Sequence, residues 1–124
     1  MTTKTRNILH WAFSGVVAFI FIGSALGKFT ANEEALKMAA SFGLNPTNYT
    51  ILGVIEIISL LFFLIPRTGI LGTLLLVSYM GGAIATHLEH GLSVLAPCII
   101  QCLLFGVAMF RFPELRNRLL NINK

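Results

Sequence analysis

Four long apolar runs, separated by short polar segments, constrain the fold of this chain more than any other feature. They cover residues 8–29, 49–66, 68–88 and 92–112. Each run is close to the ~20 residues that an α-helix needs to cross a bilayer core about 30 Å thick. Backbone groups in lipid must bond within their own segment, so the runs predict helices. We therefore predict an all-α, integral membrane four-helix bundle that forms a single domain over residues 1–124.

The low charge content argues against an ordinary soluble domain. Only 11% of the residues are charged and 56% are hydrophobic, and the mean hydropathy is +0.82. A soluble domain carries about 25% charged residues. The net charge is +4, but the basic residues lie at the ends of the apolar runs, where they set the orientation of membrane helices. We therefore expect the lipid bilayer as a partner and no nucleic acid.

The distribution of basic residues predicts the orientation in the membrane. Four spans place both termini on one side, and the opposite side then holds only Lys28 and Lys37 among the lysines and arginines. Cytoplasmic segments carry an excess of Lys and Arg. We expect a multi-pass protein of the bacterial inner membrane with both termini cytoplasmic, the cytoplasmic side holding Lys4, Arg6, Arg67, Arg111, Arg116, Arg118 and Lys124.

The polar segment between the first two runs predicts a further short helix. Apolar positions between Leu36 and Phe42 fall near one helical face. Gly43 follows as a helix stop and Pro46 lies beyond it, as is usual at helix C-termini. We predict a short interfacial helix on the outer membrane surface.

Polar side chains from different runs fall at a common depth. Glu56 lies seven residues into the second run, roughly 10 Å below its outer end at 1.5 Å per residue. Tyr79 and Gln101 each lie nine residues from the outer end of their runs, within about one helical turn of Glu56 in depth. Ionisable residues inside membranes usually face the bundle interior. We predict a ligand-binding site at this depth and in the layer above it, formed by Ser24, Lys28, Glu56, Tyr79, His87 and Gln101.

Two roles are open for Glu56. Its carboxyl group can lock the bundle together by a hydrogen bond to Tyr79, Gln101 or Ser24. It can also act in a proton relay or in substrate binding, because an acidic residue inside a membrane points by default to a function. The sequence leaves both roles open.

Glycines and a proline predict where the helices meet. Gly23 and Gly27 form a G-x-x-x-G pair, and Gly82 takes part in two further pairs of small residues with the same spacing. Small residues let membrane helices approach closely. We expect these glycines, together with Gly81, to form helix contacts. We also expect Pro97 to kink the fourth helix.

A metal site is not predicted. His87, Glu89 and His90 lie close in sequence, but His87 and Glu89 point to different sides of a helix and there is no second ligand cluster, whereas zinc needs ligands that converge. Cys98 and Cys102 lie four residues apart in an apolar run, which favours packing over redox chemistry.

Four motifs resemble the DoxX-like family of small four-helix membrane proteins. They are Gly-x-x-x-Gly-Lys at residues 23–28, "GVIEII" around Glu56, "LIPRTGILG" at residues 64–72 and "YMGGAIATHLEHG" at residues 79–91. The resemblance extends from the first run to the fourth, although the fourth carries little of it. Lys28, Glu56 and His87 match the recurrent polar positions of the family.

The resemblance implies a fold and a location more than an activity. The family takes its name from a subunit associated with a membrane thiosulfate:quinone oxidoreductase, and relatives are linked to redox complexes. We therefore expect a redox-associated membrane subunit with a polar pocket for a quinone or another small apolar ligand. It would work with a membrane or membrane-associated oxidoreductase partner or as a homo-oligomer. The alternatives are a small transporter or channel subunit that uses Glu56 as a proton or cation relay, and a purely structural assembly subunit.

Overall fold

The computed structural model describes residues 2–30 and 33–120, and within these ranges the chain forms helices and no strands. The predicted all-α membrane bundle is confirmed, and the short helix between the first two spans is present. The elements in chain order are α1 (Thr3–Phe29), α2 (Glu33–Ser41), α3 (Pro46–Leu64), the 3-10 turn η1 (Pro66–Thr68), α4 (Gly69–Glu89), α5 (Leu95–Arg111) and α6 (Pro113–Leu120).

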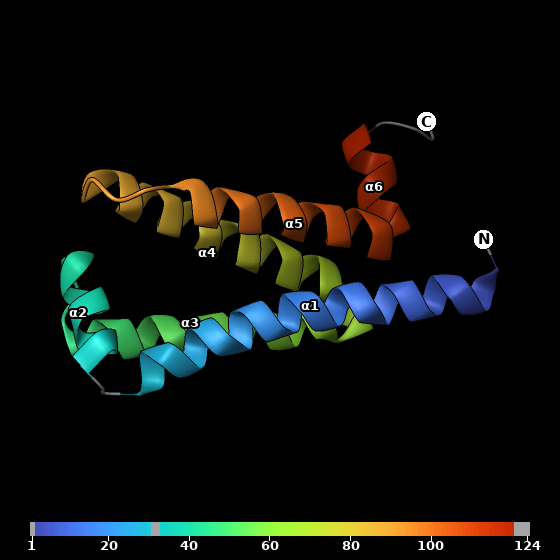
Figure 1. The fold of residues 1–124 in the computed structure, drawn as a ribbon. Helices are drawn as coiled ribbons and strands as arrows, with labels where there is room; N and C mark the ends of the chain where they lie inside the picture. Colours follow the sequence, from blue (N-terminus) through green and yellow to red (C-terminus); the bar gives the residue numbers. More distant parts are fainter. Residues whose placement is uncertain (1, 31–32, 121–124) are drawn as a thin grey trace.

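The four long helices run side by side along the length of the bundle (Figure 1). Helix α3 packs against both α1 and α4, and α5 packs against α4 and α1. Helix α2 lies at one end of the bundle, while the start of α1 and helix α6 lie at the opposite end (Figure 1). We call these the α2 end and the α6 end.

Three segments are long and apolar enough to cross a membrane by length and composition: α1, α3, and η1 with α4. Helix α5 has 17 residues, and it qualifies only together with α6, from which it is bent by 111°. The bend falls at Phe112, which has an extended backbone with φ −116° and ψ 95°. Phe112 precedes Pro113, and a residue before proline is disfavoured in the helical region.

Local side chains define where the helices begin and end. The Asn45 side chain accepts a hydrogen bond from the Asn48 backbone N–H at 2.7 Å, so α3 begins with Pro46 rather than at Tyr49. At the other end of α3, the Thr68 hydroxyl donates to the Phe62 carbonyl at 2.9 Å. Gly43 follows the end of α2 with φ +71°, a conformation that glycine adopts without steric cost.

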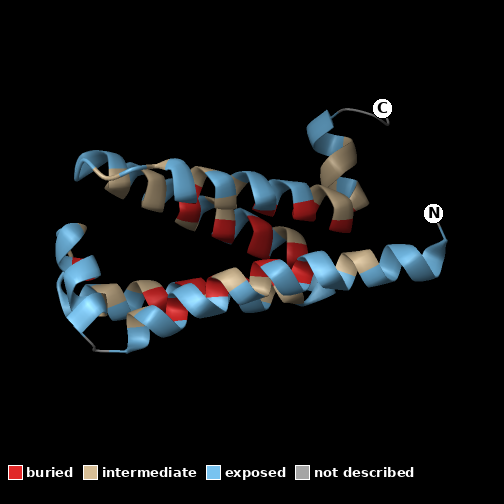
Figure 2. Ribbon diagram, viewed as in Figure 1, coloured by how far each residue is buried: buried red, intermediate tan, exposed pale blue. Residues whose placement is uncertain are grey.

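The core lies along the centre of the bundle, where the four long helices face one another (Figure 2). The outward faces carry large exposed apolar side chains, which is the surface that a bilayer requires. The buried core consists of Val17, Phe21, Leu60, Phe63, Leu76, Met80, Leu104, Val107, Ala108 and Phe112.

Several hydroxyl side chains within the spans bond to their own helix. Ser59 donates to the Ile55 carbonyl and Thr73 to the Gly69 carbonyl, both at 2.8 Å. Thr86 makes the same contact with the preceding turn. This i to i−4 bond satisfies the hydroxyl group without a partner helix, which explains how these residues are tolerated in apolar segments.

We predicted that four glycines form contacts between helices, and that prediction is wrong. A Cβ atom added at Gly23, Gly27, Gly81 or Gly82 would meet no atom within 4 Å. The tight contact with a neighbouring helix backbone is at Gly72 instead, where an added Cβ would collide with the α3 backbone at Phe62 and Phe63. Spacing alone does not show which face of a helix meets its neighbour.

The prediction that Pro97 kinks the fourth long helix is also wrong. Helix α5 begins at Leu95, so Pro97 lies in its first turn. The first four N–H groups of a helix have no intrahelical acceptor, and a proline there removes no hydrogen bond.

Arg111, which we counted among the basic residues of the cytoplasmic side, is buried at 5% exposure. Its Nη2 donates to the Leu64 carbonyl at the end of α3 at 2.7 Å. Its guanidinium carbon lies 5.6 Å from the ring centroid of Trp11 on α1 and 4.9 Å from that of Phe63. Arg111 therefore ties α1, α3 and α5 together at the α6 end, by cation–π contacts and by a bond to an orphan helix carbonyl.

Candidate functional site

A cavity of about 540 Å³ lies between the helices toward the α2 end. Its volume falls in the range of small-molecule sites, about 300 to 1,000 Å³. All of the helices except α6 contribute to it, and most of its walls are apolar, among them Phe21, Leu52, Met80 and Ile100. A cavity of this kind suits a mostly apolar ligand with few polar groups.

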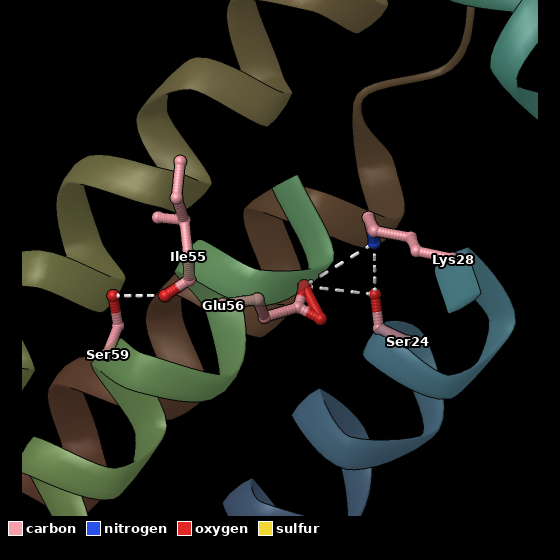
Figure 3. A network of polar contacts seen from close by, with 5 residues as sticks. All are labelled: Ser24, Lys28, Ile55, Glu56 and Ser59. Atoms are coloured by element: carbon pink, nitrogen blue, oxygen red, sulfur yellow. Dashed lines mark hydrogen bonds and ion pairs between the residues drawn. The ribbon is translucent and has the colours of Figure 1, made fainter. Parts of the chain in front are cut away.

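Ser24, Lys28 and Glu56 form a closed triangle of polar contacts between α1 and α3 (Figure 3). Lys28 Nζ donates to Ser24 Oγ at 2.6 Å and to Glu56 Oε2 at 3.4 Å. Ser24 Oγ in turn donates to the same Glu56 oxygen at 3.1 Å. Ser24 and Lys28 are four residues apart, which places them on one face of α1.

The Lys28–Glu56 ion pair is removed from solvent. The Lys28 side chain is 10% exposed and the Glu56 side chain 1%. A buried pair must regain through hydrogen bonds what it loses in hydration. The second carboxylate oxygen, Glu56 Oε1, has no hydrogen-bond partner among the described residues. The site therefore keeps one strong acceptor unused.

Two tyrosine rings flank the Lys28 ammonium group. Lys28 Nζ lies 5.4 Å from the Tyr49 ring centroid and 5.8 Å from that of Tyr79. Both distances suit a cation–π contact, which strengthens when the cation is desolvated. Tyr79 also interacts with the Glu56 carboxyl group, but without a hydrogen bond to Oε1.

His87 lines the cavity from α4. Its Nδ1 lies 2.6 Å from the Ala83 carbonyl. A carbonyl oxygen only accepts, so Nδ1 carries the proton, and in the neutral ring Nε2 is left as an acceptor. The His87 ring centroid lies 4.8 Å from that of Phe42, which connects α4 to the turn after α2.

The cavity brings together five of the six residues of the predicted site, Ser24, Lys28, Glu56, Tyr79 and His87. The sixth, Gln101, does not line it. Its Nε2 instead donates to the Val77 carbonyl of α4 at 3.5 Å.

Three cavity-lining aromatic residues were missing from the predicted site: Phe21, Phe42 and Tyr49. Tyr49 lies seven residues before Glu56 on the same stripe of α3, and this spacing was the signal that could have identified it. Phe42 gave no such signal, because its contact with His87 depends on how α2 folds over the end of the bundle.

The described residues offer no obvious metal centre. No group of three His, Cys, Asp or Glu side chains lies close enough to hold a metal within residues 2–30 and 33–120. His90 Nδ1 contacts the Thr86 carbonyl of its own helix at 3.0 Å. Cys98 and Cys102 are free, and Cys102 is exposed on the outside of the bundle.

Comparison with known proteins identifies a family. A sequence model described as the DoxX-like family matches residues 12–110, from the first turns of α1 almost to the end of α5 and including every residue that lines the cavity. No curated protein and no solved structure matches the chain.

Proposed function

The chain belongs to the DoxX-like family, and we propose that it is a redox-associated membrane subunit whose cavity binds a quinone or another small, mostly apolar ligand. The observation that carries this proposal is the position of the Ser24, Lys28 and Glu56 triangle on the wall of a mostly apolar cavity inside the bundle. Buried charge is costly in such surroundings. A role in binding the polar head of a ligand explains why these charged groups are present.

The residues present fit a quinone-type ligand. An ammonium group has three N–H donors, and Lys28 uses two of them on Ser24 and Glu56. The third can donate to a ligand oxygen. The cavity holds a ring and short substituents, so a long isoprenoid tail would extend into the bilayer. A bound quinone would supply the electron chemistry, while the described residues bind and orient its head.

Binding of a short-tailed quinone tests this proposal. The full-length chain in lipid nanodiscs is titrated with the quinone, and empty nanodiscs correct for partition into lipid. We expect Lys28→Met to weaken binding at least about ten-fold, since hydrogen bonds to charged groups contribute about 1.5 to 3 kcal/mol. Lys37→Met is the matched control, because Lys37 lies on α2 outside the cavity lining. Equal losses in both variants, or no binding by the unaltered chain, would contradict the proposal.

We also propose the bacterial inner membrane as the location, with the α6 end and both termini in the cytoplasm. The excess of Lys and Arg toward the α6 end supports this orientation. A membrane or membrane-associated oxidoreductase is the proposed partner, as the link between the DoxX-like family and redox complexes implies. Assembly of the chain with copies of itself is the competing arrangement, and a pull-down from native membranes distinguishes the two.

One observation favours a second candidate, the assembly subunit. The Lys28–Glu56 pair joins α1 to α3, so it also contributes to packing. If packing is its whole role, Glu56→Gln lowers the detergent melting temperature and leaves quinone binding unchanged. The transporter alternative predicts instead that Glu56→Gln abolishes proton or cation flux in proteoliposomes.

A further inference from the structure

The two oxygens of Glu56 have different surroundings. Oε2 accepts hydrogen bonds from Ser24 and Lys28, while Oε1 is buried and has no partner among the described residues. A carboxylate paired with an ammonium group only accepts hydrogen bonds. Leaving a buried acceptor unpaired is costly. The missing partner of Oε1 is therefore a hydrogen-bond donor.

Lys28, beside Glu56, lacks a hydrogen-bond acceptor for one of its N–H groups. Two of its three N–H groups are used within the triangle, and the rings of Tyr49 and Tyr79 flank the ammonium group. Aromatic faces do not replace an oxygen acceptor for the remaining N–H. Lys28 and Glu56 both line the cavity, so its polar end carries one unpaired acceptor and one unused donor on paired side chains.

We infer that the ligand's polar head is a hydroxyl group, which donates to Glu56 Oε1 and accepts from Lys28 Nζ. This inference rests on the proposed function, because it concerns the ligand of the same cavity. A single hydroxyl oxygen carries both roles, and the apolar walls described above receive the rest of the molecule. The ligand class is an apolar alcohol or phenol, and the reduced form of a quinone, in which both carbonyls have become hydroxyl groups, belongs to this class.

Other head groups satisfy this pair less well. A carbonyl or an ether oxygen accepts from Lys28 but leaves Glu56 Oε1 unpaired. An amine cation donates to Glu56 but adds a second positive charge beside Lys28, and a carboxylate adds a second negative charge beside Glu56. Like charges at such distances repel strongly where water is excluded.

Three probes with one apolar body test the inference: 4-hexylphenol, 4-hexylanisole and 4-hexylbenzaldehyde. Each is titrated at pH 7 against the full-length chain in nanodiscs, with empty nanodiscs as the blank. We expect the phenol to bind at least about ten-fold more tightly than the ether and the aldehyde, since a site built for a hydroxyl group discriminates against analogues that lack it. Equal affinities overturn the inference but leave the cavity as a binding site. No binding of any probe overturns the inference together with the proposed function.

Two isosteric variants show which side chain recognises the hydroxyl group of the ligand. Glu56→Gln turns part of the acceptor into an amide donor, so the preference for the phenol over the aldehyde should disappear or reverse. Tyr79→Phe removes the hydroxyl group that neighbours Glu56, and the preference should persist. If Tyr79→Phe abolishes the preference and Glu56→Gln does not, the assignment to Glu56 is wrong. Circular dichroism checks that each variant folds, and the comparison in the unaltered chain decides the inference if one does not.

Discussion

At the residue scale, Arg111 makes the most specific structural contact outside the cavity. Replacing Arg111 with Ala removes the bond to the Leu64 carbonyl and the contacts with Trp11 and Phe63. We expect a loss of about 2 to 4 kcal/mol, from lost packing and an unpaired helix carbonyl. The measurement is thermal unfolding in detergent, and the matched control is Arg67→Ala, which removes an exposed arginine at the same end of the bundle. Equal melting temperatures for the two variants would show that Arg111 is not a structural tie.

Depth was the property of the candidate site that could be predicted residue by residue. Counting 1.5 Å per residue placed Ser24, Glu56 and Tyr79 near one level, and the structure gathers them around one cavity. Gln101 lies at a similar depth but faces the Val77 carbonyl. The rotation of a helix about its axis depends on the shapes of its neighbours, and the sequence of one helix does not contain them.

At the element scale, the contact between α3 and α4 depends on Gly72. A Cβ there would collide with the backbone at Phe62 and Phe63, and backbone cannot move aside as a flexible side chain can. We expect Gly72→Ala to destabilise the bundle by at least about 1 to 3 kcal/mol, measured as a lower melting temperature in detergent. Gly81→Ala, in the same helix, should be neutral or stabilising, because its Cβ enters open space and Ala is the better helix former. A neutral Gly72→Ala would mean that α3 and α4 are not in close contact.

The ends of the helices were predictable where hydropathy changes sharply along the sequence. They were less predictable where the residues of a turn are apolar. The α3 to α4 turn falls where Pro66 interrupts the pattern, and α2 ends before Gly43, as expected. The fourth run began too early in the prediction, because residues 92–94 are mostly apolar yet lie outside the helix. Gly91, with φ +70°, allows a turn there that hydropathy does not reveal.

At the scale of the whole molecule, the start of α1 and helix α6 lie at one end (Figure 1). We expect that end to face the cytoplasm. In a background without Cys98 and Cys102, Lys37→Cys on α2 should react with an impermeant maleimide in intact cells. Arg118→Cys on α6 should react only after lysis. Labelling of Arg118→Cys alone in intact cells would reverse the proposed orientation.

The central claim is that the cavity binds a ligand, and two adjacent glycines test it most directly. Gly81 and Gly82 both have open space for a side chain, but only Gly82 lines the cavity. We expect Gly82→Leu to fill part of the cavity and to abolish binding of a short-tailed quinone in nanodiscs. Gly81→Leu should keep the affinity of the unaltered chain. If both variants bind equally well, the ligand does not occupy this cavity and the account is wrong.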